Sequence, residues 1–197
     1  MKIKILVVLV VLITNLSCTY ILFTRHIEKT LDERLNFNQT GKISKTYYFS
    51  TTSVVNYLNE YIESKGTEIT NLQINNVRLS VGLGNQNTAS VLNNVEVSLN
   101  VGSSGNLKYF KINSIPLNFL VSITVNEYLD KKGVQELRKF LEENIVGKRE
   151  KVFSLIIKAD IPSGQRFTGD ISIKMDVTMD AETCEKVFLG FEGARCL

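Results

Sequence analysis

Tryptophan is absent from the 197-residue sequence, and histidine, proline and cysteine are scarce, with one, two and three residues. Two prolines and twelve glycines exclude a collagen-like or low-complexity chain, in which these residues are abundant. The hydrophobic fraction of 44% is ordinary for a globular protein, and the length suffices for one domain with its own core. The composition therefore predicts one folded domain rather than a disordered chain.

The sequence has one histidine, His26, and this scarcity excludes most histidine-dependent catalytic sites. His26 lies near the N-terminus, outside the expected domain body, so we expect no Ser-His-Asp or Cys-His site there. A zinc site is not expected, because the sequence has no Cys-x-x-Cys pair. The absence of tryptophan also removes the side chain best suited to stack on sugars. We expect no enzyme activity, no metal and no cofactor; a hydrolase with paired carboxylates is the enzymatic alternative.

The charge of the chain is small and unevenly placed. The formal net charge is +3, and Lys2 and Lys4 contribute two of these positive charges. The rest of the chain holds 21 basic and 20 acidic residues and is close to neutral. Because phosphate binding needs a basic surplus on one face, we expect no nucleic-acid partner.

Residues 5–13 are nine consecutive apolar residues behind a short lysine-containing start. This is the pattern of an export signal, and we assign residues 1–24 to a signal peptide or membrane anchor. The segment Asn15-Leu16-Ser17-Cys18 resembles the lipobox of bacterial lipoproteins, which implies cleavage before Cys18 and lipidation of its sulfur. As a second ending, residues 5–23 remain as an uncleaved span, near the roughly 20 residues that cross a bilayer. The third possibility is that the signal is cleaved and the body is released from the membrane.

The charges that flank the apolar run predict the orientation of the chain. Lys2, Lys4 and the amino terminus precede the run, whereas Arg25 and Lys29 behind it are offset by nearby acidic residues. The more positive flank stays in the cytoplasm. We therefore expect the body to be exported and membrane-anchored, on the periplasmic or cell-surface face.

The two remaining cysteines, Cys184 and Cys196, both lie in the last fourteen residues. An even number of cysteines in an oxidising compartment favours a disulfide, which would close a C-terminal tail over residues 184–197. Closing such a short loop would stabilise the fold by roughly 3 kcal/mol. Two free thiols are the alternative.

The composition divides the body into a linker and a domain. Residues 25–50 are polar without a sustained period, and we predict a polar linker that runs into an edge strand at residues 43–49. Residues 51–183 form the predicted domain. Two helices are expected in it, one over residues 53–65 with Ser53 as its cap and one over residues 130–146 behind Asp130.

Alternation of apolar and polar residues dominates the rest of the domain and predicts β-strands. Asn75-Asn76 and Asn93-Asn94 interrupt this alternation, and we interpret both pairs as β-bulges or strand starts, because asparagine tolerates unusual backbone angles. Six to eight short strands with turns between them are typical of a mainly β, antiparallel, immunoglobulin-like β-sandwich. The expected strands cover residues 72–83, 92–101, 119–125, 152–160 and 171–180.

One family resemblance follows from the order of these segments. A lipobox-like Cys18 and a polar tether precede the run Ile69-Thr-Asn-Leu-Gln-Ile-Asn-Asn-Val-Arg-Leu-Ser-Val81, and the domain closes on Asp170-Ile-Ser-Ile-Lys-Met-Asp-Val-Thr-Met179. Over residues 66–181 the chain resembles the small single-domain β-sandwich lipoproteins on the surface of Bacteroidota-type bacteria. The resemblance implies an immunoglobulin-like scaffold and an envelope location, with no shared catalytic residues.

The sequence thus favours a non-enzymatic binding or structural module of the cell envelope. Its partners would be the membrane, through the N-terminal lipid or helix, and a protein docked at an exposed edge strand or at the loop over residues 160–170. The alternative is a domain that binds a lipid or another apolar ligand between the sheet and the helix over residues 130–146. A filled interior would favour the first hypothesis, as would a long open strand edge.

Overall fold

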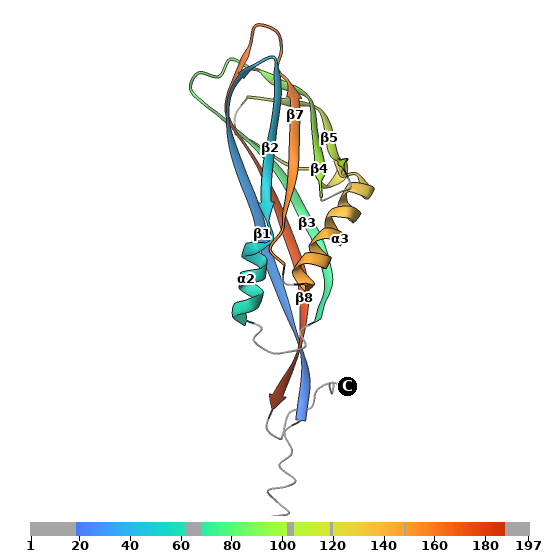
Figure 1. The fold of residues 1–197 in the computed structure, drawn as a ribbon. Helices are drawn as coiled ribbons and strands as arrows, with labels where there is room; N and C mark the ends of the chain where they lie inside the picture. The colour runs from blue at the N-terminus through green and yellow to red at the C-terminus, as the bar shows by residue number, and fades with distance from the viewer. Residues whose placement is uncertain (1–18, 62–67, 102–104, 119, 148, 188–197) are drawn as a thin grey trace, which may run out of the picture.

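A computed structural model describes residues 19–61, 68–101, 105–118, 120–147 and 149–187. Most of this chain is strand, with two short α-helices (Figure 1). The strands are β1 (Thr19–Thr40), β2 (Lys42–Ser50), β3 (Glu68–Leu83), β4 (Val91–Asn100), β5 (Asn106–Pro116), β6 (Val121–Thr124), β7 (Val152–Asp160) and β8 (Arg166–Val187). The helices are α2 (Thr52–Tyr61), the 3-10 turn η2 (Asn126–Tyr128) and α3 (Lys131–Val146).

The strands form two antiparallel four-stranded sheets that face each other. Sheet A has the order β1-β8-β3-β6 and sheet B the order β2-β7-β4-β5. The predicted mainly β, antiparallel sandwich is confirmed. The first and last strands pair, and so do β2 with β7, β3 with β6 and β4 with β5, which is the nested order of an eight-stranded jelly roll. An immunoglobulin domain would instead place its first two strands side by side in one sheet.

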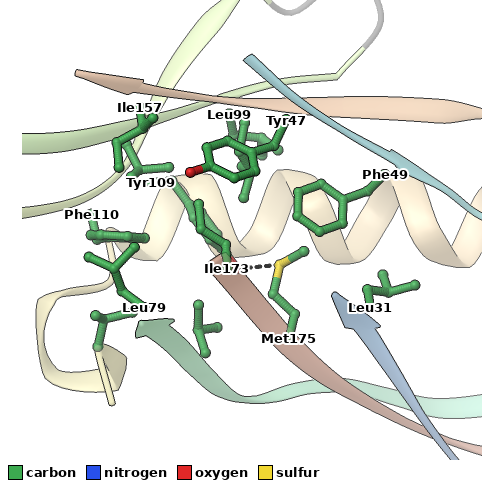
Figure 2. Close-up of a cluster of buried hydrophobic side chains, with 14 of the residues drawn as sticks. Leu31, Tyr47, Phe49, Leu79, Leu99, Tyr109, Phe110, Ile157, Ile173 and Met175 are labelled. Carbon is green, nitrogen blue, oxygen red and sulfur yellow. Dashed lines mark hydrogen bonds between the residues drawn. The ribbon is translucent and has the colours of Figure 1, made fainter. Parts of the chain in front are cut away.

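The core lies between the two sheets and is filled by side chains from alternating strand positions. β7 shows the pattern, with Phe153, Leu155 and Ile157 buried and the residues between them more exposed. Two buried tyrosines of sheet B reach across to sheet A. The Tyr47 hydroxyl donates to the carbonyl oxygen of Ile171 at 3.0 Å. The Tyr109 hydroxyl lies 3.6 Å from the sulfur of Met175 (Figure 2).

Helix α3 closes the sandwich on the side of β3 and β5. Asp130 caps it, as predicted, by accepting hydrogen bonds from the backbone N–H groups of Lys132 and Gly133. The apolar stripe turns inward, and the helix ends at Val146, as expected from the sequence. Helix α2 begins at Thr52, one residue before the predicted cap, Ser53. The backbone of Thr51 accepts its first hydrogen bonds.

Three asparagines adopt the left-handed backbone conformation, with φ of 51° at Asn71, 42° at Asn76 and 49° at Asn94. The pairing of β3 with β8 shifts register around Asn71 and again between Asn75 and Arg78, and the pairing of β4 with β7 shifts around Asn94. The two bulges predicted at the asparagine pairs are therefore confirmed. The bulge at Asn71 has no second asparagine beside it and was not predicted.

The predicted polar linker over residues 25–50 is corrected, because residues 25–40 belong to β1, whereas the edge strand predicted at residues 43–49 is confirmed as β2, at the edge of sheet B. Ile27, Leu31 and Phe37 of β1 are buried in the core. The apolar residues are sparse because β1 lies at the edge of sheet A, with one polar face and an inward face that is only partly covered. The domain therefore starts before residue 51, and residues 184–187, predicted as tail, belong to β8.

β1 and β8 pair without a register shift over 22 residues, from Thr19 opposite Val187 to Thr40 opposite Arg166. β3 leaves this ladder at Glu68, which pairs with Glu182, so the last five pairs form a two-stranded ribbon below the sandwich (Figure 1). Residues 19–23, part of the alternative membrane span, are strand backbone here. Within the described segments, no helix combines the length and hydropathy that a bilayer crossing requires.

Candidate functional site

The most distinctive surface of the described chain is the open edge of β1. β1 pairs with β8 on one side, and among the described strands none pairs with its other side. Its neighbour there, β2, belongs to the opposite sheet and turns away after the corner at Gly41. Long edge strands of this kind expose a row of unpaired N–H and C=O groups that can accept another strand.

One contact indicates which backbone groups of β1 face this edge. The Lys45 ammonium of β2 donates to the carbonyl oxygen of Asn36 in β1. Peptide groups alternate in direction along an antiparallel strand, so even-numbered residues of β1 present their N–H and C=O groups to the open edge. Lys45 also lies 4.5 Å from the ring centre of Phe37 and covers the upper end of the edge. At the lower end, β3 joins the ladder at Glu182, which lies opposite Thr24, so the open stretch within the sandwich is residues 24–34.

A groove follows the middle of this stretch. Residues 30–33 of β1 form one wall, and the end of β2 with the first turn and a half of α2 forms the other. Its volume is about 460 Å³. Leu31 and Phe49 contribute buried apolar surface beneath it, whereas its rim carries hydroxyl, amide and carboxylate groups such as those of Thr52 and Asn56. An extended peptide laid along β1 would meet polar groups at the rim and apolar groups below.

Cross-strand polar pairs fix the outer face of sheet A beside the edge. Arg34 contacts Asp170 at 2.6 Å, and Lys174 contacts Asp32 at 3.1 Å, so both pairs join β1 to β8. Asp176 of β8 accepts from the Thr30 hydroxyl at 2.8 Å. Surface pairs such as these contribute at most about 1 kcal/mol each. Their main effect is to hold the side chains that flank the edge in defined positions.

His26 belongs to a separate cluster lower on the same face. Its Nδ1 lies 2.9 Å from Asp180, its Nε2 lies 3.5 Å from Glu28, and Asn71 donates to the second Asp180 oxygen at 3.0 Å. The hydrogen bond to Asp180 raises the pKa of the imidazole above its ordinary value of 6.5. The hydrogen bonds from His26 and then Asn71 lower the pKa of the Asp180 carboxyl. The bulge at Asn71 thus brings β3 into contact with the β1–β8 pair.

The residues predicted to carry function from the sequence lie elsewhere. Cys18 and Cys196 fall outside the described residues, and with them the lipidation and the disulfide to Cys184. The backbone of Cys184 lies in β8 opposite Leu22. Among the described residues, no three His, Cys, Asp or Glu side chains are grouped as a metal site would require.

The second predicted docking route, the loop over residues 160–170, is shorter than expected. β8 begins at Arg166, so only residues 161–165 join it to β7, and Gly164 adopts a φ of 74° in the turn. Asp160 accepts from Asn94 at 2.9 Å. The loop is a tight hairpin connection rather than an extended binding loop.

The β1 edge was missed because the sequence of residues 25–50 was interpreted as a linker. A period-2 pattern of Ile27, Leu31, Leu35 and Phe37 was present, but charged residues occupy the inward positions 29 and 33 and interrupt it. The partner strand, β8, is more than 120 residues away in the sequence, so no local sequence pattern predicts this pairing.

A second exposed surface lies on the outer face of sheet B. Tyr48 and Val152 are 66% and 56% exposed, and they line a shallow hollow of about 450 Å³ with Ile156 and uncharged neighbours. Of the two strands beneath the hollow, β7 is paired on both sides, with β2 and β4, whereas β2 is the edge strand of sheet B.

The fold and the open edge together define a two-sheet jelly roll with a long exposed first strand. Comparison with known proteins adds little to this description. No family model matches the chain, and no curated protein matches it. Structures of infectious bursal disease virus, Gx and Gt strains, align at TM-scores of 0.25 and 0.23 with 13% and 12% identity. The alignments cover 86% and 84% of this chain but 37% of each matched chain, and these TM-scores are too low to support an inference.

Proposed function

We propose that the protein is an exported, membrane-tethered, non-enzymatic module of the cell envelope that docks a protein partner along the open edge of β1. The observation that carries this proposal is the stretch of β1 over residues 24–34, whose outward backbone groups have no strand beside them among the described residues. A partner strand added there would extend sheet A to five strands. Each new main-chain hydrogen bond would contribute about 1 kcal/mol net.

The groove beside residues 30–33 gives the docking a source of selectivity. Side chains of an added strand alternate between the two faces of the sheet. One set would meet the cross-strand polar pairs on the outer face, and the other would enter the groove above Leu31 and Phe49. Backbone bonds thus supply affinity, and the alternating side chains select the partner.

The alternative, a binder of a lipid or another apolar ligand, has less support. Such a ligand would lie between the sheets and α3, where Leu137, Leu141 and Ile145 are 0–1% exposed and already fill the space. The location rests on the sequence, in which the apolar run over residues 5–13 precedes Cys18.

The docking proposal is tested with a matched pair of substitutions at Asp32. Asp32→Pro removes a backbone N–H that faces the open edge, whereas Asp32→Ala removes the same carboxylate and keeps the N–H. Partners captured in mild detergent by the wild-type chain and by Asp32→Ala should be lost from Asp32→Pro, while all three proteins unfold at similar temperatures. Equal capture by Asp32→Pro would contradict docking at this edge.

The tether is tested by the intact mass of the protein isolated separately from the membrane and soluble fractions of its native cells. A mass that matches a chain starting at Cys18 with added lipid supports the lipoprotein form. An intact Met1 without lipid supports the uncleaved anchor, and an unlipidated, cleaved chain in the soluble fraction would contradict tethering.

A further inference from the structure

The charges along β1 point to a specific occupant of its open edge. We infer that this occupant is β1 of a second copy of the chain, paired antiparallel about a two-fold axis at Leu31. The inference rests on the proposed docking edge and adds the identity and register of the partner. It joins the two copies of sheet A into one continuous eight-stranded sheet.

Backbone direction limits the registers that are available. Even-numbered residues face the edge, so in an antiparallel pair even residues of one copy must lie opposite even residues of the other. A two-fold axis at Leu31 satisfies this condition and places Glu28 opposite Arg34 and Thr30 opposite Asp32. By symmetry each of these pairs occurs twice. The four edge-facing residues then exchange about eight main-chain hydrogen bonds between the copies.

The outer face of this junction is complementary in charge. Glu28 and Arg34 are 76% and 67% exposed, and they lie on the face that carries the cross-strand ion pairs. In the Leu31 register, Glu28 of each copy lies opposite Arg34 of the other. Opposite charges directly across a strand pair are stabilising. Arg34 keeps its contact with Asp170 on its other side, so the junction extends an existing charge network.

The inner face of the junction is complementary as well. Leu31 lies opposite Leu31 of the other copy, and Ile27 lies opposite Leu35 in two symmetry-related pairs. Apolar side chains therefore lie opposite apolar side chains. Lys29 lies opposite Glu33 twice. These charged residues occupy inward-facing positions of the strand and are half-buried. Because they interrupt the alternation of apolar residues, the sequence of β1 resembles a polar linker. In the paired state each of them faces a residue of opposite charge.

Neighbouring registers lose this match. An axis at Thr30 places Glu28 opposite Asp32 and His26 opposite Arg34. An axis at Asp32 places that carboxylate opposite its own copy and leaves Lys29 opposite Leu35. Like charges directly across a strand pair are destabilising, so charge selects the Leu31 register. Lys45, bound to the carbonyl of Asn36, limits the pairing at the upper end.

The mass of the full chain in mild detergent gives the first test. At micromolar concentration we expect a dimer, unchanged in Asp32→Ala and dissociated in Asp32→Pro. Glu33→Lys places one lysine opposite Lys29 of each partner, which gives two like-charge pairs per dimer, and should weaken the dimer about tenfold. The double variant Lys29→Glu/Glu33→Lys restores opposite charges and should restore the dimer. Because it has the same net charge as wild type, a general charge effect would not explain the rescue.

A zero-length carbodiimide cross-link fixes the register. A mixture of ¹⁵N-labelled and unlabelled chains should give a Lys29–Glu33 cross-linked peptide that carries one label of each kind, which only a contact between copies produces. Within one strand these residues are four positions and roughly 13 Å apart, too far for this cross-link.

The outcomes separate this inference from the proposed function. A monomeric chain that captures another protein in an Asp32→Pro-sensitive manner overturns the second copy and leaves the docking edge in place. A dimer that survives Asp32→Pro, or that cross-links without the Lys29–Glu33 pair, overturns the β1 register. A dimer that Glu33→Lys weakens and the double variant restores, with the mixed-label cross-link, supports it.

Discussion

The two tyrosine hydroxyls that cross the core have unequal acceptors. Tyr47 donates to a main-chain carbonyl, that of Ile171, whereas Tyr109 faces the thioether sulfur of Met175. Burial raises the pKa of both hydroxyls above the ordinary value of 10, which favours the protonated form that can donate a hydrogen bond. A carbonyl oxygen is a strong acceptor and a thioether is a weak one. The two residues are therefore similar in burial but differ in the polar bond that each one makes.

Tyr47→Phe should lower the free energy of unfolding by about 1–3 kcal/mol, because it leaves the Ile171 carbonyl buried without this donor. Tyr109→Phe serves as the control and should cost well under about 1 kcal/mol, since only a weak contact to sulfur is lost. Urea unfolding followed by circular dichroism measures both. Equal losses in the two variants would contradict a special role for the Tyr47 bond.

His26 gives a direct measurement of charge coupling, because it is the only histidine in the sequence. Its raised pKa means that the folded state favours the imidazolium. This contribution to stability is fully present below pH 6.5 and is lost as the pH rises through the raised folded pKa. An NMR titration of the single imidazole should give a midpoint above 6.5.

Asp180→Asn should bring this midpoint back toward 6.5, and Glu28→Gln should move it less, because the Asp180 hydrogen bond is the larger cause. Titration of the wild-type imidazole at or below 6.5 would show that the His26–Asp180 contact does not persist in solution.

At the scale of elements, the asparagine bulges show what a local sequence pattern can predict. The pairs at Asn75-Asn76 and Asn93-Asn94 predicted the bulges because left-handed backbone is a property of the residue itself. Helix α3 was predictable for a similar reason, since its cap and its apolar stripe are contiguous in sequence. The start of α2 was misplaced by one residue, because Thr51 is hydrogen-bonded to Arg149 and Lys151, in a segment that is distant in sequence.

Asn76→Gly should leave the stability within a few tenths of a kcal/mol, because glycine adopts a φ of 42° without strain. Asn76→Val should destabilise the protein by about 1–2 kcal/mol, since a branched side chain is strained there. Gln73→Val, on the same strand but with an ordinary backbone, is the control and should be neutral or stabilising. Thermal unfolding compares the three; a tolerated Asn76→Val would argue against the bulge.

At the scale of the whole molecule, the nested strand order makes the fold depend on its last strand. β8 is the neighbour of both β1 and β3 in sheet A, so neither strand is paired correctly until β8 is present. Pairing the first strand with the last gives long-range contacts, which are expected to form slowly. This feature explains one limit of the sequence interpretation. Local patterns identified the two helices and the strands other than β1 and β5, but the β1 edge exists only through a partner at the other end of the chain.

A chain that stops at Gln165 should therefore fail to fold, whereas one that stops at Val187 retains all eight strands and should unfold cooperatively. Circular dichroism and binding of a hydrophobic dye distinguish the two, since the shorter chain exposes the inner face of sheet B. A cooperative transition in the shorter chain would show that sheet A does not need β8.

The uninterrupted β1–β8 ladder also determines how the molecule carries mechanical load. If the chain is held in the membrane before Thr19 while a partner is bound to the body, the pull acts along the length of β1. The hydrogen bonds of the 22-residue ladder are then loaded together in shear. A force that pulls Thr19 away from Val187, across the strands, would instead break the same hydrogen bonds one pair at a time, in the unzipping geometry. The ribbon is thus strong in the direction in which a tethered, partner-bound protein would be pulled, and weak across it.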